Sequence, residues 1–150
     1  MSVAFRRESD EEHREPRFEL PIPAGPNLVT ARGRVLIDER IAALDAALRE
    51  AQPDQTEAIR RDLRYWNTRR TTAVETTAPT DGSVGFGSEV ELTLAGRRRN
   101  FVIVGDDEAD PGAGLIAFSS PLALALTGAE AGDVLPFNGR DDAIELLSVG

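Results

Sequence analysis

The residues with the greatest capacity for chemistry are carboxylates. The densest cluster falls between two stretches with strand character and consists of Asp106, Asp107, Glu108 and Asp110. Several carboxylates in one loop could hold Mg²⁺ for phosphoryl chemistry. The chain has no lysine to pair with a phosphate and no P-loop, and solvated acidic turns between strands are common. We therefore expect a recognition loop that faces basic groups on a partner.

A second set of acids surrounds Pro53 and consists of Glu50, Asp54 and Glu57. Acids near a helix N-terminus complement the helix dipole, a contribution of about 0.3–1 kcal/mol each. That effect is sufficient to explain Asp54 and Glu57. The alternative is that the set presents carboxylates to a metal ion in the active site of another molecule.

Arginines are concentrated just after this set, at Arg60, Arg61, Arg64, Arg69 and Arg70. They have few acidic counter-charges nearby in the sequence. They form either a solvated helix face that pairs with acids of the preceding segment or a face that contacts nucleic acid, namely RNA.

Composition excludes several kinds of site. The 150 residues include no cysteine, no lysine and one histidine, His13. These absences exclude a disulfide scaffold, a cysteine nucleophile, a Ser-Lys pair, a His-based triad and a multi-His zinc site.

Charge is unevenly distributed along the chain, whose net charge is −9. Residues 26–79 contain nine arginines and eight acids, whereas residues 80–150 contain four arginines and twelve acids. The acidic C-terminal half argues against duplex DNA as its partner and favours a basic protein surface. No apolar run approaches the roughly 20 residues of a membrane span. We expect a soluble, cytoplasmic monomer with no membrane partner.

Two amphipathic segments predict an antiparallel helical hairpin over residues 28–76. Proline at position 53 ends the first segment, and Asp54 with Glu57 forms a capping-box pattern for the second. The apolar residues recur at spacings of three and four: Ile37, Ile41, Leu44 and Leu48, then Ile59, Leu63 and Trp66. Residues 1–27 contain four prolines, and we expect an extended lead-in there, or a contact arm anchored by Phe5, Phe18 and Leu20.

After a linker at residues 76–83, the hydrophobic period becomes two. This pattern predicts strands at 89–94, 100–104, 115–118, 134–137 and 143–149, and Ser120-Pro121 predicts a short helix at 121–126. Ala95-Gly96 and Asn138-Gly139 are the predicted hairpin turns. The expected fold is α+β, with the helical hairpin followed by a small antiparallel sheet and one short helix at 84–150.

Four segments carry distinctive motifs: NLVTARG (27–33), VGFGSEVEL (84–92), IVGDDEAD (103–110) and LIAFSSPLALALTGAEAGDV (115–134). The last three resemble the C-terminal domain of the bacterial GreA/GreB transcript cleavage factors, and the first resembles the entry into the coiled coil of that family. The resemblance implies an FKBP-like C-terminal domain that docks at the rim of the RNA polymerase secondary channel. It also implies that the coiled coil enters the channel, where tip acids help to hold the second catalytic Mg²⁺ of the polymerase.

Under this resemblance, the docking face would include Asp106–Asp110 and Ser119, Ser120 and Pro121. The family's acidic tip motif, of the type Asp-Leu-Lys-Glu-Asn, has no counterpart between Arg49 and Ile59. The hairpin is also shorter than the family's by about 12 residues per arm, which reduces its reach by about 18 Å at the helical rise.

A short hairpin on this C-terminal domain is similar to the Rnk-type regulators, which bind polymerase without the full cleavage apparatus. The resemblance therefore predicts a polymerase-binding regulator without strong cleavage stimulation, which is not itself an enzyme and has no cofactor. The alternatives are a genuine cleavage factor and an FKBP-like peptidyl-prolyl isomerase. The isomerase needs an aromatic pocket, whereas Tyr65 and Trp66, the chain's one Tyr and one Trp, both lie in the helical segment.

Overall fold

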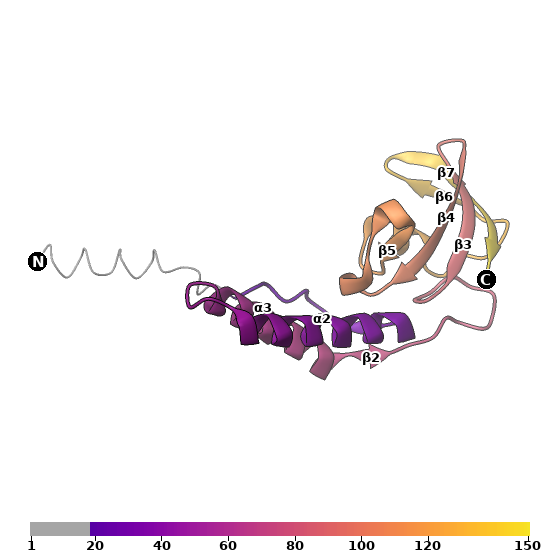
Figure 1. The fold of residues 1–150 in the computed structure, drawn as a ribbon. Helices are drawn as coiled ribbons and strands as arrows, with labels where there is room; N and C mark the ends of the chain where they lie inside the picture. Colours follow the sequence, from indigo (N-terminus) through magenta and orange to yellow (C-terminus); the bar gives the residue numbers. More distant parts are fainter. Residues whose placement is uncertain (1–18) are drawn as a thin grey trace, which may run out of the picture. The chain divides into compact units, whose positions relative to one another are not determined.

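The computed structural model describes residues 19–150, which form two compact units (Figure 1). One unit contains residues 19–24 and 37–71, and the other contains residues 25–36 and 72–150. The expectations for His13, Phe5 and Phe18 lie outside the described residues. No helix of residues 19–150 combines the length and apolar character that crossing a membrane requires.

The helical hairpin consists of α2 (Ala31–Glu50) and α3 (Thr56–Thr72), which the chain joins through a turn at residues 51–55. Ile37, Ile41 and Leu63 are buried, as the apolar spacing predicted. The guanidinium of Arg40 on α2 lies 5.7 Å from the centroid of the Trp66 ring on α3. This cation–π contact adds to the apolar packing between the two helices.

The start of α3 differs from the predicted capping box. The helix begins at Thr56, so Asp54 lies too early in the chain to cap it. Inside the turn, the backbone N–H of Gln52 donates to the side chain of Gln55 at 3.1 Å, and the Thr56 hydroxyl donates to the Pro53 carbonyl at 3.0 Å. These bonds stabilise the turn, and the carboxylate of Asp54 is exposed to solvent.

The two ends of the hairpin are joined by a short parallel pair of strands that the sequence pattern did not predict. Leu28 and Val29 form β1 (Leu28–Val29), which pairs with β2 (Val74–Glu75). The N–H of Val74 donates to the Asn27 carbonyl and that of Thr76 to the Val29 carbonyl, both at 2.9 Å. The predicted start of the helical pattern at Leu28 is therefore corrected, because residues 28 and 29 form a strand and α2 begins only at Ala31.

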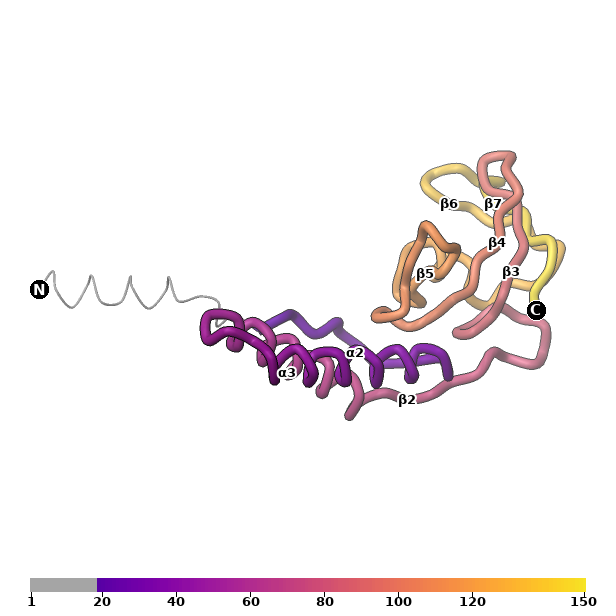
Figure 2. The backbone as a smooth tube through the Cα atoms, viewed as in Figure 1, coloured from indigo at the N-terminus to yellow at the C-terminus, as the bar shows by residue number. Residues whose placement is uncertain are grey.

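The second unit contains a five-stranded sheet in the order β5-β4-β3-β7-β6, traced by the tube in Figure 2. Its strands are β3 (Glu89–Leu94), β4 (Arg97–Val104), β5 (Leu115–Ala117), β6 (Val134–Phe137) and β7 (Arg140–Val149). The sheet is mixed rather than purely antiparallel, because β5 runs parallel to β4. The two short 3₁₀ turns η2 (Asp106–Glu108) and η3 (Pro111–Ala113) lie in the connection that makes this parallel return.

Both predicted hairpin turns have a left-handed backbone, which Asn and Gly adopt readily and which is unusual for Ala95. Asn138 and Gly139 have φ angles of 52° and 83°, and Ala95 and Gly96 have angles of 54° and 79°. Two consecutive positive φ angles match the right-handed twist of the flanking strands.

The core lies between one face of the sheet and the short helix α4 (Pro121–Leu126). Leu92, Ile144 and Leu146 of the sheet are fully buried, as are Ala123 and Leu126 of α4. The alternation of buried and exposed residues along β3 and β7 produces the period of two seen in the sequence.

Candidate functional site

The predicted acidic cluster forms a tight turn at the end of β4, which we call the acidic turn (residues 105–110). Its four carboxylates differ in exposure: Asp110 is exposed, Asp106 and Asp107 are half-buried, and Glu108 is buried. From the sequence alone, these four carboxylates could not be distinguished. The structure assigns them two different environments.

Glu108 is turned inward, toward the base of α2. Its Oε1 accepts a hydrogen bond of 2.5 Å from the Thr30 hydroxyl, and its Oε2 lies 3.3 Å from the Arg32 guanidinium. The Glu108 side chain is only 5% exposed. A carboxylate bonded in this way stabilises the junction between the hairpin base and the sheet domain, and it is not presented to a partner.

Two glycines allow this close approach. A Cβ at Gly33 would lie 2.9 Å from the Glu108 carboxylate, and a Cβ at Gly105 would overlap the carbonyl oxygen of Leu28. The segments NLVTARG and GDDEAD, far apart in the sequence, therefore interlock. A glycine in each segment is the only sequence signal of this contact.

The start of α4 lies beside the acidic turn. The Ser119 hydroxyl donates to Asp106 Oδ1 at 2.7 Å, so these two predicted site residues are brought together. The Ser120 hydroxyl accepts from the Ala123 N–H at 3.3 Å, and Pro121 occupies the first turn. Ser120 and Pro121 thus have a capping role that needs no partner. We use the name docking face for the residues predicted to dock other than the buried Glu108, namely Asp106, Asp107, Asp110, Ser119, Ser120 and Pro121.

The acids of the hairpin tip lie at the predicted end of the arm. Glu50, Asp54 and Glu57 are all exposed. Oε2 of Glu57 lies 3.3 Å from Nη2 of Arg64. Within residues 19–150, no three His, Cys, Asp or Glu side chains are grouped in a way that could hold a metal ion.

The five arginines of α3 do not form a single exposed face. Arg60, Arg64 and Arg70 are exposed, whereas Arg61 is half-buried and pairs with Asp62 at 3.2 Å. Arg69 is only 2% exposed, and its guanidinium lies 6.0 Å from the Tyr65 ring centroid. The expected basic face is therefore corrected to exclude Arg69, because a spacing of four along a helix places this residue beside Tyr65.

Arg64 is held by a residue from the proline-rich lead-in. The Nε and Nη2 atoms of Arg64 donate to the two carboxylate oxygens of Glu19 at 2.6 and 2.8 Å. These bonds from Arg64 lower the pKa of the Glu19 carboxyl below its ordinary value of 4.5 and raise the pKa of the guanidinium. Sequence reasoning considered an arm anchored by apolar residues and missed this ion pair.

A pH dependence follows from the lowered pKa of Glu19. Because the pKa is lower when Glu19 is bonded than when it is detached, the ion pair contributes fully above pH 4.5 and is lost as the pH falls through the lowered value. Arg64, Arg61 and Glu57 are the charged groups that face it. We expect the Glu19 carboxyl carbon to titrate with a midpoint below 4.5 in an NMR titration. A midpoint at or above 4.5 would contradict the ion pair.

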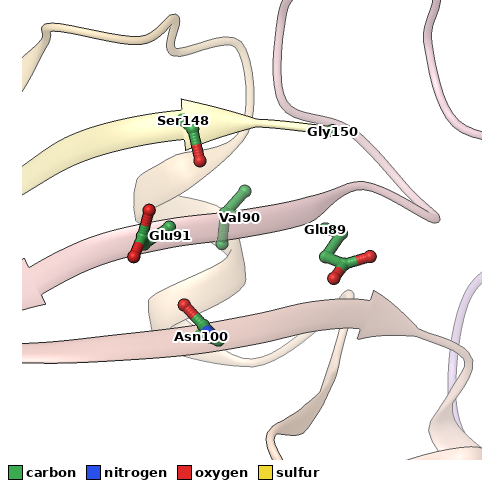
Figure 3. Close-up of a pocket in the computed structure, with 6 residues that line it drawn as sticks. All are labelled: Glu89, Val90, Glu91, Asn100, Ser148 and Gly150. Atoms are coloured by element: carbon green, nitrogen blue, oxygen red, sulfur yellow. The ribbon is translucent and has the colours of Figure 1, made fainter.

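A polar hollow of about 390 Å³ lies over β3, β4 and β7 (Figure 3). Glu89, Glu91, Asn100 and Ser148 line it, together with Val90 and Gly150. Glu91 pairs with Arg98 at 2.6 Å. This lining has no aromatic wall, which disfavours the hollow as a prolyl isomerase pocket. Phe86 and Phe118 instead form an edge-to-face pair with centroids 5.5 Å apart.

Comparison with known proteins finds similarity mainly in the C-terminal half of the chain. Residues 78–149 match the family model described as "Transcription elongation factor, GreA/GreB, C-term". The GreA of Thioalkalivibrio sulfidiphilus is 42% identical over 78 residues, which are 49% of each chain. The GreA of Rhizobium etli is 38% identical over 86 residues, which are 55% of this chain and 54% of the relative. The chain thus matches about half the length of these curated relatives.

Among solved structures, Gfh1 of Thermus thermophilus, a GreA factor homologue, is 19% identical with a TM-score of 0.40, covering 84% of this chain and 99% of that one. The GreA/GreB factor of Nitrosomonas europaea is 15% identical with a TM-score of 0.39, covering 84% of this chain and 98% of that one. The likeness to the family depends on the sequence matches. Residues 78–149 match the C-terminal domain of the GreA/GreB transcription elongation factors, and about half of the chain is similar to curated GreA proteins.

Proposed function

We propose that this protein binds RNA polymerase at the rim of the secondary channel and regulates elongation without strong stimulation of transcript cleavage. The docking face contacts the polymerase, and the helical hairpin extends toward the channel. The protein acts as a cytoplasmic monomer that is not itself an enzyme. The lead-in (1–27), the hairpin (28–76) and the C-terminal domain (84–150) are its functional parts.

The observation that carries this proposal is the combination of a sheet domain that matches the family with a short arm. Residues 78–149 match the family along the whole sheet domain. The arms α2 and α3 have 20 and 17 residues, which correspond to roughly 30 and 26 Å at 1.5 Å per residue. A carboxylate has to lie within about 2.0–2.6 Å of a magnesium or calcium ion to bind it. Side-chain rotation cannot make up for a shortening of a full helical turn or more.

The chemistry of the tip supports the same conclusion. Glu57 shares Arg64 with Glu19, so a positive charge lies next to this carboxylate. A carboxylate that already bonds an arginine is a poorer metal ligand, because that bond uses a lone pair of the carboxylate and the positive charge of the arginine repels the cation. Glu50 and Asp54 are the remaining exposed tip acids.

Two assays test the proposal together. In the first, labelled protein is titrated with core polymerase, and we expect saturable binding at micromolar concentration or below. In the second, a stalled, backtracked complex is incubated with the protein, and we expect little transcript cleavage. Robust cleavage that is lost in Asp54→Asn would identify a genuine cleavage factor instead, and absence of binding would reject the polymerase assignment.

A second candidate function is contact between the helical arm and RNA. The exposed residues Arg60, Arg64 and Arg70 support it, since arginine binds phosphate oxygens through a planar fork. Nascent RNA would be the natural ligand of an arm that extends into a transcribing polymerase. A steep fall in affinity with rising salt would be the signature of this contact.

A further inference from the structure

The lead-in segment packs along α3 within the helical unit. We call residues 19–24 the strap. Glu19, Leu20 and Ile22 of the strap and Arg64, Tyr65 and Thr68 of α3 line a shallow cavity of about 170 Å³. Pro21 and Pro23 fix the backbone of the strap, so less conformational freedom is lost when it packs against the helix. The strap thus covers one side of α3 beside its basic residues.

The ion pair between Glu19 of the strap and Arg64 of α3 has the geometry with which arginine binds a phosphate. Arg64 donates two nearly parallel bonds to the two oxygens of Glu19, at 2.6 and 2.8 Å. Arginine binds a phosphate through the same fork, because a phosphate also presents two oxygens in one plane. The Glu19 carboxylate therefore occupies the position in which Arg64 would hold a phosphate group.

The surroundings of Arg64 favour nucleic acid over an acidic protein. Arg60 is exposed one helical turn before Arg64, and the half-buried Tyr65 lines the strap cavity. A positively charged track with an adjoining aromatic ring is typical of proteins that bind single-stranded nucleic acid. Both partners of the Glu19–Arg64 pair are about half exposed. Exposed pairs of this kind are weak, so a ligand with several phosphates can displace the carboxylate.

We propose that the strap is an intramolecular competitor of RNA: Glu19 occupies Arg64 in the free protein, and single-stranded RNA displaces the strap when it binds α3. This inference rests on the proposed RNA contact of the helical arm. It adds a regulatory element that lies outside the residues 78–149 that match the family. Any partner that removes the strap from α3 would in turn increase the affinity of the arm for RNA.

The test measures binding of a fluorescein-labelled 12-nucleotide oligouridine to the full chain by anisotropy at low salt. Glu19→Gln is expected to tighten binding about two- to fivefold, which is the range that an exposed ion pair can supply. Glu39→Gln is the matched control, because it removes the same charge from an exposed residue of α2. Glu39→Gln should produce less than half of the gain in RNA affinity that Glu19→Gln produces. Arg64→Gln should weaken binding and remove the effect of Glu19→Gln in the double variant.

The possible outcomes distinguish a failure of the strap proposal from a failure of the proposed RNA contact on which it rests. Equal affinities of Glu19→Gln and Glu39→Gln would overturn the strap and leave the RNA contact in place. No binding of the oligonucleotide by any variant would overturn both. Glu19→Gln could instead leave the affinity for RNA unchanged and bind core polymerase more tightly. That result would overturn the RNA assignment and identify a protein-binding face. The measurements with the oligonucleotide alone do not depend on the docking face of the C-terminal domain.

Discussion

Replacing Gly105 with alanine is expected to destabilise the protein by about 2–3 kcal/mol, because the added methyl group would overlap the carbonyl oxygen of Leu28. A flexible side chain could move away, but this neighbour is backbone in a hydrogen-bonded strand. Either β1 or the acidic turn has to shift. We expect a fall in the melting temperature on the order of 10 °C for a domain of this size.

Gly112→Ala is the matched control for this substitution. Gly112 lies in the same connection, and the nearest atom to its added Cβ would be Asp110 Oδ1 at 3.7 Å, an ordinary contact distance. Neither glycine has a positive φ angle, so backbone strain does not distinguish them. Thermal denaturation of both variants beside the parent protein gives the comparison. Equal melting temperatures for the two variants would contradict the interlocking of β1 with the acidic turn.

Removing two charges from the docking face is expected to weaken binding to core polymerase about tenfold at low salt. The double variant Asp107→Asn, Asp110→Asn keeps the shape of both side chains and removes two of the carboxylates that we propose to face the polymerase. Rim charges act mainly on the association rate, because they steer the encounter of two complementary surfaces. The loss of affinity should therefore appear as a lower association rate, and it should become smaller as the salt concentration rises.

The control for this pair carries the same change in net charge at another place on the domain. Asp141 and Asp142 are adjacent exposed acids near the start of β7. Asp141→Asn, Asp142→Asn should alter the polymerase affinity by less than twofold. Kinetic binding measurements at several salt concentrations distinguish the pairs. Equal losses in both double variants would mean that net charge, rather than the docking face, determines binding.

The sheet domain could be predicted closely because its local signals agree with its fold. Asn138-Gly139 predicted a turn between β6 and β7, and both residues have the positive φ angles that such a turn requires. Ser120-Pro121 predicted the start of α4, and Ser120 caps it. Such signals act over a few residues, so they can be read from the sequence without tertiary information.

The features that were missed depend on contacts between distant residues. β1 and β2 have two residues each, too few to show any hydrophobic period. The inward orientation of Glu108 depends on Thr30, which lies 78 positions earlier in the chain. The parallel pairing of β5 depends on the path of the acidic turn, which composition does not specify. The position of the candidate site could therefore be predicted from the sequence. The buried, structural carboxylate could not be distinguished from the exposed ones.

The central claim is that the short hairpin binds inside the polymerase channel entrance without bringing its acids to the catalytic metal. The most direct measurement is a crosslink map of the complex with core polymerase, using a photoreactive amino acid in place of Asp54 at the exposed tip. We predict crosslinks to the rim and outer wall of the secondary channel. Crosslinks to the loop that holds the catalytic magnesium would contradict the claim and identify the hairpin as a donor of metal ligands.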